Sequence, residues 1–346
     1  MPARRAPERA TMHDVARRAE VSIKTVSRVV NGEPGVSEAL ATRVRTAVQE
    51  LGYRHNLAAS NLRRGQRTAS IGVLVDDLGN AFCSEVLRAI EDRARGRGIV
   101  LLASSTDEDV DRERELIDGL LSRRIDGMIV MPTGRDQRHL TVEHADGVPV
   151  VTVDRRPADP GIDGVVVDNA GGARTAVAHL LAHGHRRIGI LGDASDIVTA
   201  LERRDGYRRA LADAGLPHDP ALERLGARTR EEASAHATEL LALADPPTAF
   251  FAARNVLCTG VVDALRRQGR SHEVGLVGFD DVPLAELLDP PVTVIRQDTR
   301  AIGEQAMDLL LARLDGDQGP GRVVDLPTEL VVRGSGEIPA PAVDRG

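Results

Sequence analysis

Several residue types are scarce in this sequence of 346 residues. It contains no tryptophan, two tyrosines and a single lysine, Lys24. The two cysteines, Cys83 and Cys258, belong to no Cys-x-x-Cys pair, which argues against a zinc site or a disulfide framework. No apolar run reaches about 18 residues, and the N-terminal "MPARRAPERA" lacks the apolar core of a signal peptide. We therefore predict a cytoplasmic protein with reduced thiols and no membrane partner.

Common catalytic and nucleotide-binding motifs are also missing. Patterns of the Gly-x-Gly-x-x-Gly, P-loop, Gly-x-Ser-x-Gly and His-Glu-x-x-His types do not occur. His179, His183 and His185 form a cluster that offers a metal site as one interpretation. Gly184 interrupts the helix between the last two, and no cysteine or carboxylate joins them in the sequence. We interpret them as helix-end histidines and expect no enzyme activity, no cofactor and no metal.

The formal net charge of -7 hides an asymmetry along the chain. Residues 1–67 hold 13 Lys and Arg against 6 Asp and Glu, whereas the remainder holds 32 against 46. A small basic module suited to phosphates is thus joined to a large acidic module. The predicted division is a disordered arm at 1–10, the folded basic module at 11–53, a linker at 54–67, a large domain at 68–336 and a flexible tail at 337–346.

Three amphipathic helices are predicted in the basic module. "TMHDVARRAEVS" has Thr11 as a helix N-cap and Asp14 three residues later, the spacing of a capping box. "VSEALATRVRTAVQELG" has Ser37 as its cap and Gly52 as its stop. Its expected apolar stripe consists of Leu40, Val44, Val48 and Leu51.

The middle helix is expected to run from its cap, Ser22, to Val30, within "VSIKTVSRVVNG". At about 100° per residue, its valines gather on one side and its polar residues on the other. The short turn before it is typical of a helix-turn-helix, in which the second helix enters the major groove of DNA. The alternative is that Lys24 and Arg28 belong to an ordinary solvated face.

The segment "TMHDVARRAEVSIKTVSRVVNGEPGVSEALATRVRTAVQELGYRHN" resembles the DNA-binding headpiece of the lactose-repressor (LacI/GalR) family without a gap. The resemblance implies that Ile23, Lys24 and Arg28 contact bases. Arg28 can bridge N7 and O6 of a guanine, and Ile23 can pack on a thymine methyl group. The residues implied to contact or orient phosphates are Thr11, Ser22, Thr25, Ser27, Asn31 and Ser37.

The linker "HNLAASNLRRGQRT" is too short and polar to form a core, and one interpretation is a plain flexible connection. Alternatively, Asn56 caps a short helix that folds only when docked, because isolated helices of this length are unstable in water. The family resemblance implies a hinge helix that pairs with its dimer mate and wedges Leu62 into the minor groove. Asn61 departs from the family pattern.

From Ala69 onward, strand-like runs such as "IGVLV", "DGMIVM", "RIGILGD" and "VGLVGFDD" alternate with amphipathic helical stretches. This alternation predicts an α/β domain with parallel sheets covered by helices on both faces. The region resembles the two-lobed, periplasmic-binding-protein-like effector domain of the same family. The resemblance implies that lobe one spans about 68–168 and 297–327 and that lobe two spans about 169–296 and 328–336. It also implies a cleft for a small-molecule effector and a homodimer.

Transfer of the family's ligand positions gives a candidate pocket. Asp154 in "TVDRR", Thr199, Arg203 and Asp280 in "GFDD" match polar ligand-binding positions, and two carboxylates with an arginine suit sugar hydroxyls. For any single acidic residue, a strand-end cap or surface charge is an equal alternative.

The sequence departs from the family pattern at two places in this pocket. Arg254-Asn255 stands where an Asn-Asp pair is common, and "NAFCSE" keeps Phe82 but has Cys83 at a second aromatic position. We hypothesise that Arg254 favours a ligand with a carboxylate or phosphate, and that the missing aromatic disfavours a stacked base.

Taken together, these features predict a repressor that binds a pseudo-palindromic double-stranded operator as a homodimer, controlled by a carbohydrate-like effector. Two alternatives are a cytoplasmic solute-binding sensor without DNA binding and a sugar-modifying enzyme on the same fold. The tail "EIPAPAVDRG" has no leucine heptad, which argues against tetramers through a C-terminal coiled coil.

Overall fold

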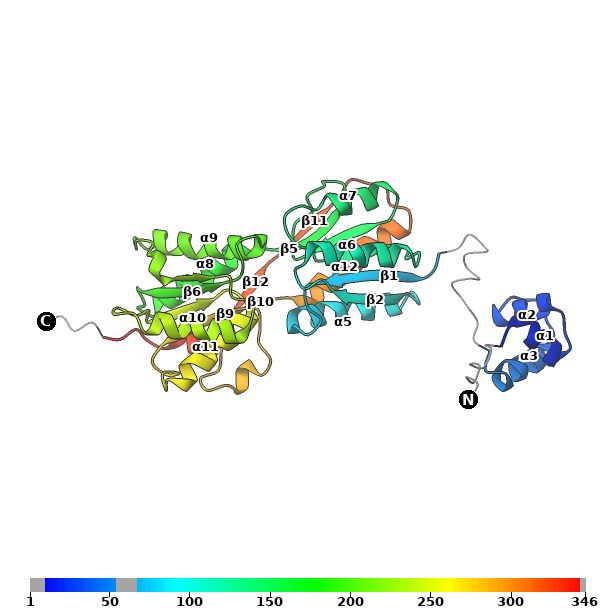
Figure 1. The fold of residues 1–346 in the computed structure, drawn as a ribbon, viewed down its shortest axis with the longest axis horizontal. Helices are drawn as coiled ribbons and strands as arrows, with labels where there is room; N and C mark the ends of the chain where they lie inside the picture. The colour runs from blue at the N-terminus through cyan, green and yellow to red at the C-terminus, as the bar shows by residue number, and fades with distance from the viewer. Residues whose placement is uncertain (1–9, 54–66, 343–346) are drawn as a thin grey trace, which may run out of the picture. The chain divides into compact units, whose positions relative to one another are not determined.

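The computed structural model describes residues 10–53 and 67–342 and divides into two compact units, one ending at Thr68 and one starting at Ala69 (Figure 1). The predicted arm up to residue 9 and most of the predicted hinge, including Asn56 and Leu62, lie outside the described residues. Within the described ranges, no helix is both long and apolar enough to cross a bilayer.

The first unit contains the three predicted helices, α1 (Met12–Ala19), α2 (Ile23–Val30) and α3 (Glu38–Glu50). Thr11 and Asp14 form the predicted capping box, and the Ser22 side chain accepts a hydrogen bond from the backbone N–H of Thr25. Ser37 occupies the N-cap position of α3 without a side-chain cap hydrogen bond. The short polar caps therefore define where α1 and α2 begin.

The small core of this unit corrects the apolar stripe that we predicted for α3. Val44 is fully buried and Val48 packs against the core, as expected, but the other buried residues of α3 are Ala41 and Ala47, and Leu51 is 36% exposed. Side chains without branches let α3 approach α1 and α2 closely, which a leucine at the same positions would prevent. Val15 and Val26 complete this core from α1 and α2.

The second unit consists of two lobes, each built on a six-stranded sheet. In lobe one the strands have the order β11-β5-β4-β3-β1-β2, and all pairs are parallel. Their bounds are β1 (Ser70–Val75), β2 (Val100–Ser105), β3 (Met128–Val130), β4 (Val150–Val153), β5 (Asp163–Val167) and β11 (Val323–Leu326). The helices of this lobe are α5 (Ala81–Arg95), α6 (Val110–Leu121), α7 (Arg138–Ala145) and α12 (Thr299–Leu314).

Lobe two repeats this plan with the order β12-β10-β9-β8-β6-β7. Its strands are β6 (Ile188–Gly192), β7 (Glu223–Leu225), β8 (Ala249–Ala252), β9 (Gly275–Phe279), β10 (Thr293–Gln297) and β12 (Thr328–Val331). The edge strand β12 is antiparallel to β10, so this sheet is not parallel throughout. Its helices are α8 (Asn169–Ala182), α9 (Val198–Asp213), α10 (Arg230–Leu241) and α11 (Asn255–Arg267).

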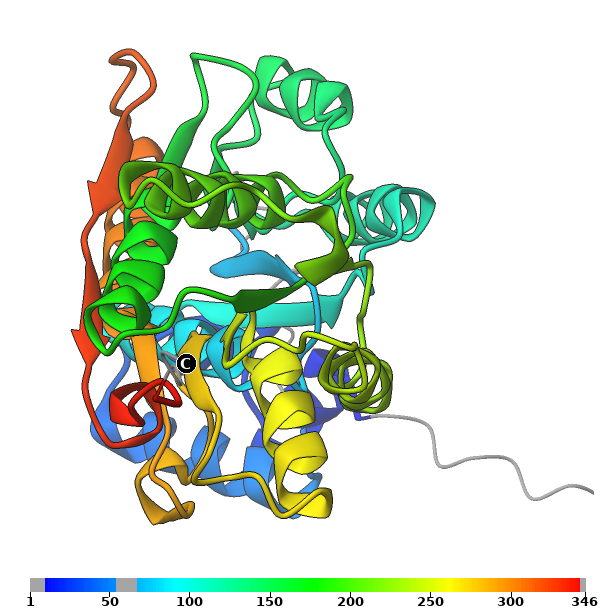
Figure 2. The ribbon, with the colours of Figure 1, turned by 90° about the vertical axis from the view of Figure 1, so that its left-hand side faces the viewer.

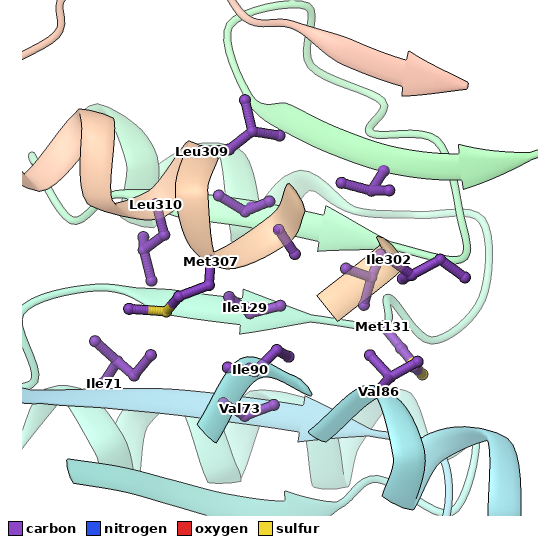
Figure 3. Packing of buried hydrophobic residues seen from close by; sticks show 14 of the residues in the cluster. Ile71, Val73, Val86, Ile90, Ile129, Met131, Ile302, Met307, Leu309 and Leu310 are labelled. Atoms are coloured by element: carbon purple, nitrogen blue, oxygen red, sulfur yellow. The ribbon is translucent and has the colours of Figure 1, made fainter. Parts of the chain in front are cut away.

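Alternate residues of each strand point to separate cores on the two faces of a sheet. In lobe one, α5 and α12 cover one face, and Figure 3 shows Val86, Ile90, Ile302 and Met307 converging on Ile71, Val73 and Ile129 of the strands. In lobe two, Phe250 packs in the core under α10 and α11, whereas Phe251 packs in the core under α8 and α9. Figure 2 shows this second lobe facing the viewer, with β12 in red at its edge.

The chain crosses between the lobes three times, and each crossing contains one residue between regular elements. Asp168 joins β5 to α8, Asp298 joins β10 to α12, and Pro327 joins β11 to β12. Both aspartates also cap the helix that follows, through Gly171 N–H and Ala301 N–H respectively. The two lobes are thus linked by very short segments.

The beginning of the predicted flexible tail is held on lobe two, which corrects that assignment for residues 337–340. The Glu337 carboxylate contacts His179 and accepts a hydrogen bond from the Thr293 hydroxyl at 2.9 Å. His185 Nε2 lies 2.8 Å from the carbonyl oxygen of Ile338, and Ala340 N–H donates to the His183 carbonyl. These polar contacts fix a segment whose composition alone indicates a loose end.

Candidate functional sites

The outward face of α2 carries the three residues that we expect to read bases. Val26 is fully buried on the other side, while Ile23 is 41% exposed and Lys24 is exposed. Among residues 10–53, every other arginine is engaged in an ion pair with a carboxylate, as in Arg18–Glu50. Lys24 and Arg28 have no such pair in this range. Two uncompensated cations therefore stand beside an exposed apolar side chain.

Most of the hydroxyl and amide groups predicted to meet phosphates are linked to one another. The hydroxyls of Ser22 and Thr25 lie 2.9 Å apart, and the Asn31 amide donates to the Ser27 carbonyl and hydroxyl at 2.6 and 3.1 Å. Thr11 differs, because its hydroxyl donates to Asp14 at 2.6 Å. These bonds fix the side chains at both ends of α2 in place before any contact with DNA.

The cleft of the second unit is lined by four aspartates that each directly follow a strand. Asp76 follows β1 and Asp154 follows β4 in lobe one, whereas Asp193 follows β6 and Asp280 follows β9 in lobe two. Asp154 and Asp280 even share the same left-handed backbone, with φ of 67° in each. Ligands of open α/β sheets bind at the carboxyl ends of the strands, which is where these side chains meet.

All seven residues that we predicted for the effector pocket line one cavity. They are Phe82, Cys83, Asp154, Thr199, Arg203, Arg254 and Asp280. Sequence reasoning missed the remaining lining residues, namely Asp76, Asn80, Glu108, Met131, Arg155, Asp193, Ile197, Ala200 and Ala253. Two of them, Asp76 and Asp193, could have been found, because each is the aspartate that ends a strand-like run, "IGVLVD" and "RIGILGD" respectively.

Arg203 of α9 is held rigidly at the floor of this cavity. Its Nε donates to Asn169 at 2.8 Å, and its Nη1 donates to the Ala253 carbonyl at 2.9 Å and lies 3.6 Å from the Asp280 carboxylate. The guanidinium also stacks 3.8 Å above the centre of the Phe279 ring. A buried guanidinium with this support presents a fixed set of N–H donors.

Arg254 joins the two lobes through an ion-pair bridge. Its Nη1 lies 2.6 Å from Asp193 in lobe two, and its Nη2 contacts Asp76 in lobe one. Burial alone would lower the pKa of the Arg254 guanidinium, but the two carboxylates raise that pKa above its ordinary value. Burial raises the pKa of Asp76. The hypothesis that Arg254 attracts an anionic ligand is weakened, because its charge is already neutralised by two carboxylates.

Next to this bridge, two buried amides connect the lobes. Asn80 Nδ2 donates to Asn255 Oδ1 at 3.1 Å, and Asn255 Nδ2 donates to Asn80 Oδ1 at 2.9 Å. Asn80 is the N-cap of α5 and Asn255 is the first residue of α11. The cavity that remains has a volume of about 50 Å³, enough for a few water molecules.

The wall contributed by lobe one has two groups without hydrogen bonds. Arg155 binds Glu108 with both terminal nitrogens, but its buried Nε has no hydrogen-bond partner among the described residues. Asp154 lies 3.7 Å from this Nε, beyond hydrogen-bonding distance. Burial raises the pKa of Asp154, and the nearby Asp280 carboxylate adds to this effect. Both side chains line the cavity.

Cys83 is buried, and the three clustered histidines are engaged in polar contacts within the chain. Cys83 lies 3% exposed with its Sγ 3.9 Å from the Met131 sulfur, and burial raises the pKa of its thiol to about 12. Glu337 supplies His179 with the carboxylate that sequence reasoning did not find. Even so, no group of three metal-ligating side chains occurs in the described part of the chain.

Comparison with known proteins assigns these two units to one family. Residues 11–56 match the model for bacterial regulatory proteins of the lacI family, and residues 177–336 match a periplasmic binding protein-like domain. The chain is 33% identical over 339 residues to the transcriptional repressor CytR of Escherichia coli K12, covering 97% of this chain and 98% of that protein. The chain belongs to the lacI family. This lacI-family protein is also 31% identical to the transcriptional repressor PurR of Aliivibrio salmonicida. The match covers 94% of this chain and 98% of PurR.

Solved structures agree with this assignment. The lac repressor dimer bound to operator and the anti-inducer ONPF superimposes on this lacI-family protein with a TM-score of 0.82 at 30% identity, covering 95% of this chain and 99% of the other. The CelR–cellobiose complex gives a TM-score of 0.71 at 31% identity, with 94% and 100% covered. This protein is therefore a DNA-binding transcriptional repressor regulated by effector binding, and its relatives are repressors rather than enzymes.

Proposed function

We propose that this lacI-family repressor binds a pseudo-palindromic operator as a homodimer, with Ile23, Lys24 and Arg28 reading bases in the major groove. The observation that carries the proposal is the outward face of α2, where the only lysine and Arg28 lack the carboxylate partners of the other arginines in residues 10–53. A free guanidinium can contact two acceptors of a guanine at once. The exposed Ile23 beside them suits a thymine methyl group.

The proposed phosphate contacts come from Ser22, Thr25, Ser27 and Asn31, with Thr11 and Ser37 at the starts of α1 and α3. Helix N-termini favour phosphate because their first N–H groups are unpaired and the helix dipole is positive there. The linked hydroxyls of Ser22 and Thr25 lie at such an end. Leu62, outside the described residues, remains the proposed minor-groove wedge.

The homodimer has a structural candidate for part of its interface. Leu284 and Leu287, between β9 and β10, are 64% and 72% exposed, which is unusual for such large apolar side chains. The lac repressor in the structure cited above is a dimer. Sedimentation velocity of wild type and Leu287→Glu tests this interface, because a buried glutamate pair would shift the dimer toward monomer.

We further propose that the cleft binds a carbohydrate-like effector in the cytoplasm. Fixed guanidinium donors on Arg203 and carboxylate acceptors on Asp154 and Asp280 face the same space, and such pairs suit neighbouring hydroxyls. CelR was solved with cellobiose, which supports this class for a protein of the same fold. An effector alters DNA affinity only through different affinities for two conformations of the lobes.

The decisive experiment selects duplexes that the full-length protein retains, from a random library and from its own promoter region. We expect sequence-selective binding that weakens as salt rises, because bound arginines displace counterions from phosphates. If no duplex is retained with or without a panel of sugars, the proposed function is wrong. Calorimetry with the same sugars tests the cleft independently.

A further inference from the structure

The two lobes also meet at the carboxyl ends of β1 and β6, which we call the lip of the cleft. In lobe one the order β5-β4-β3-β1 places β1 three strand spacings from the crossing at Asp168, and in lobe two the order β10-β9-β8-β6 places β6 equally far from Asp298. Three strand spacings amount to about 14 Å. A contact at the lip therefore opposes rotation of the lobes far from the crossings that connect them.

Two successive residues of lobe two, Arg254 and Asn255, make contacts across this lip. Arg254 Nη2 contacts Asp76, which follows β1, and the amide of Asn255 exchanges two hydrogen bonds with the amide of Asn80, at 2.9 and 3.1 Å. Asp193, which belongs to the same lobe as Arg254, lies 2.6 Å from its Nη1 and orients the guanidinium. The beginning of α11 is thus bound to the segment between β1 and α5.

These contacts are shielded from water. Asn80 and Asn255 are 7% and 5% exposed, and the side chains of Arg254 and Asp76 are 18% and 16% exposed. Opposite charges attract more strongly at such a shielded place than on an open surface, because less water screens them. Separation of the lobes at the lip breaks the ion pair and both amide hydrogen bonds together.

Without Arg254, the charges of the two lobes would oppose closure. Asp154 of lobe one and Asp280 of lobe two line the same cavity, so closure brings two carboxylates toward each other. Arg155 and Arg203, which also line the cavity, form ion pairs within their own lobes. In the described part of the chain, Arg254 is the one arginine of this cavity that contacts carboxylates of both lobes.

We propose that Arg254 and Asn255, with their partners Asp76 and Asn80, form a latch that keeps the two lobes closed when no effector is bound. Closed lobes are then the resting conformation and not a result of ligand binding. An effector has to find the latch open before it enters the cleft, so regulation starts from the closed side of the equilibrium. This inference goes beyond the proposed function, because it concerns the unliganded protein and holds whichever effector binds.

The distance between two spin labels, one on each lobe, reports this closure directly. Glu115→Cys on α6 and Ala235→Cys on α10 place the labels at exposed positions. Cys83 and Cys258 stay unlabelled at about pH 7.5, because burial raises the pKa of both thiols to about 12. Double electron–electron resonance is recorded on the full-length protein without effector or DNA. An excess of unlabelled protein ensures that distances within one chain dominate.

Wild type should give one narrow distance distribution. The double variant Arg254→Met/Asn255→Ala should lengthen the mean distance by about 2.5 Å or more, because about 10° of rotation parts the lip by about 2.5 Å at about 14 Å from the crossings. Asp76→Asn weakens only the ion pair across the lip and leaves Arg254 on Asp193, so it should lengthen the distance less. This milder variant keeps the test decisive if the double variant does not fold.

Arg208→Met is the matched control. It removes an arginine from an ion pair with Glu223 that lies wholly within lobe two, so the distance should stay as in wild type. The proposal is overturned if the latch variants keep the wild-type distance, if wild type already shows the longer distance, or if Arg208→Met lengthens it as much as they do. Because the distances are measured without DNA, a failure of the proposed operator binding leaves this test intact.

Discussion

Replacing the single lysine tests whether α2 reads bases. Lys24 is exposed and forms no ion pair or hydrogen bond among residues 10–53, so Lys24→Ala should change the free energy of unfolding by less than about 0.5 kcal/mol. A lost base contact costs about 1–3 kcal/mol, which is about 5- to 150-fold in affinity for each half-site. The variant should therefore fold normally and bind its preferred operator much more weakly.

How the loss of affinity varies among DNA sequences distinguishes a base contact from a phosphate contact. Fluorescence anisotropy should show that Lys24→Ala binds the selected operator with much lower affinity than wild type does. On a single-base variant of the operator that lacks the contacted base, the two proteins should differ little in affinity. The slope of log affinity against log salt should stay nearly constant, because a phosphate contact would contribute about 0.9 to it. Arg45→Ala is the matched control, since it removes an exposed charge that is paired with Glu38. Uniform weakening of all duplexes by Lys24→Ala would refute base reading.

Three further predictions concern the folded units. Val44→Ala should destabilise the small core of the first unit by about 2 kcal/mol, so operator binding should be lost. The main unfolding transition reports the larger second unit, and its Tm should stay unchanged. Retained DNA binding would contradict this prediction. Burial raises the pKa of Cys83 and Cys258 to about 12, so mass spectrometry after iodoacetamide treatment at about pH 8 should show no alkylation of the native protein and full alkylation in denaturant. Burial lowers the pKa of His185 below its unfolded value, so the unfolded chain binds more protons and Tm should fall as the pH drops below about 6.5. His185→Gln should flatten this decline, and an unchanged pH profile would exclude His185 as its source.

The sequence predicted the DNA-binding unit better than the cleft, and the reason is the range of the interactions. Thr11 with Asp14, and Ser22 with Thr25, act within one helical turn, so their spacing alone predicts where α1 and α2 begin. The buried face of α3 could not be obtained in the same way. Which apolar residues of α3 are buried depends on how closely the three helices approach one another. In this unit Ala41 and Ala47 are buried, whereas Leu51 is exposed.

In the second unit, alternating strands and helices predicted the parallel architecture, and the family resemblance supplied seven lining residues. The partners of Arg254 were not predictable, because Asp76 and Asp193 lie far from it in sequence and in different lobes. The repeated strand-aspartate pattern was visible, yet it does not reveal which carboxylates meet across the cleft. Contacts such as His179 with Glu337 likewise join positions 158 residues apart.

The three single-residue crossings at Asp168, Asp298 and Pro327 determine how the lobes can move. Each crossing offers two backbone torsions, except that the proline ring fixes one of them. Three short tethers limit sliding and separation, and favour rotation about an axis that passes close to all three. Effectors of different size would then change the angle between the lobes rather than the direction of their rotation.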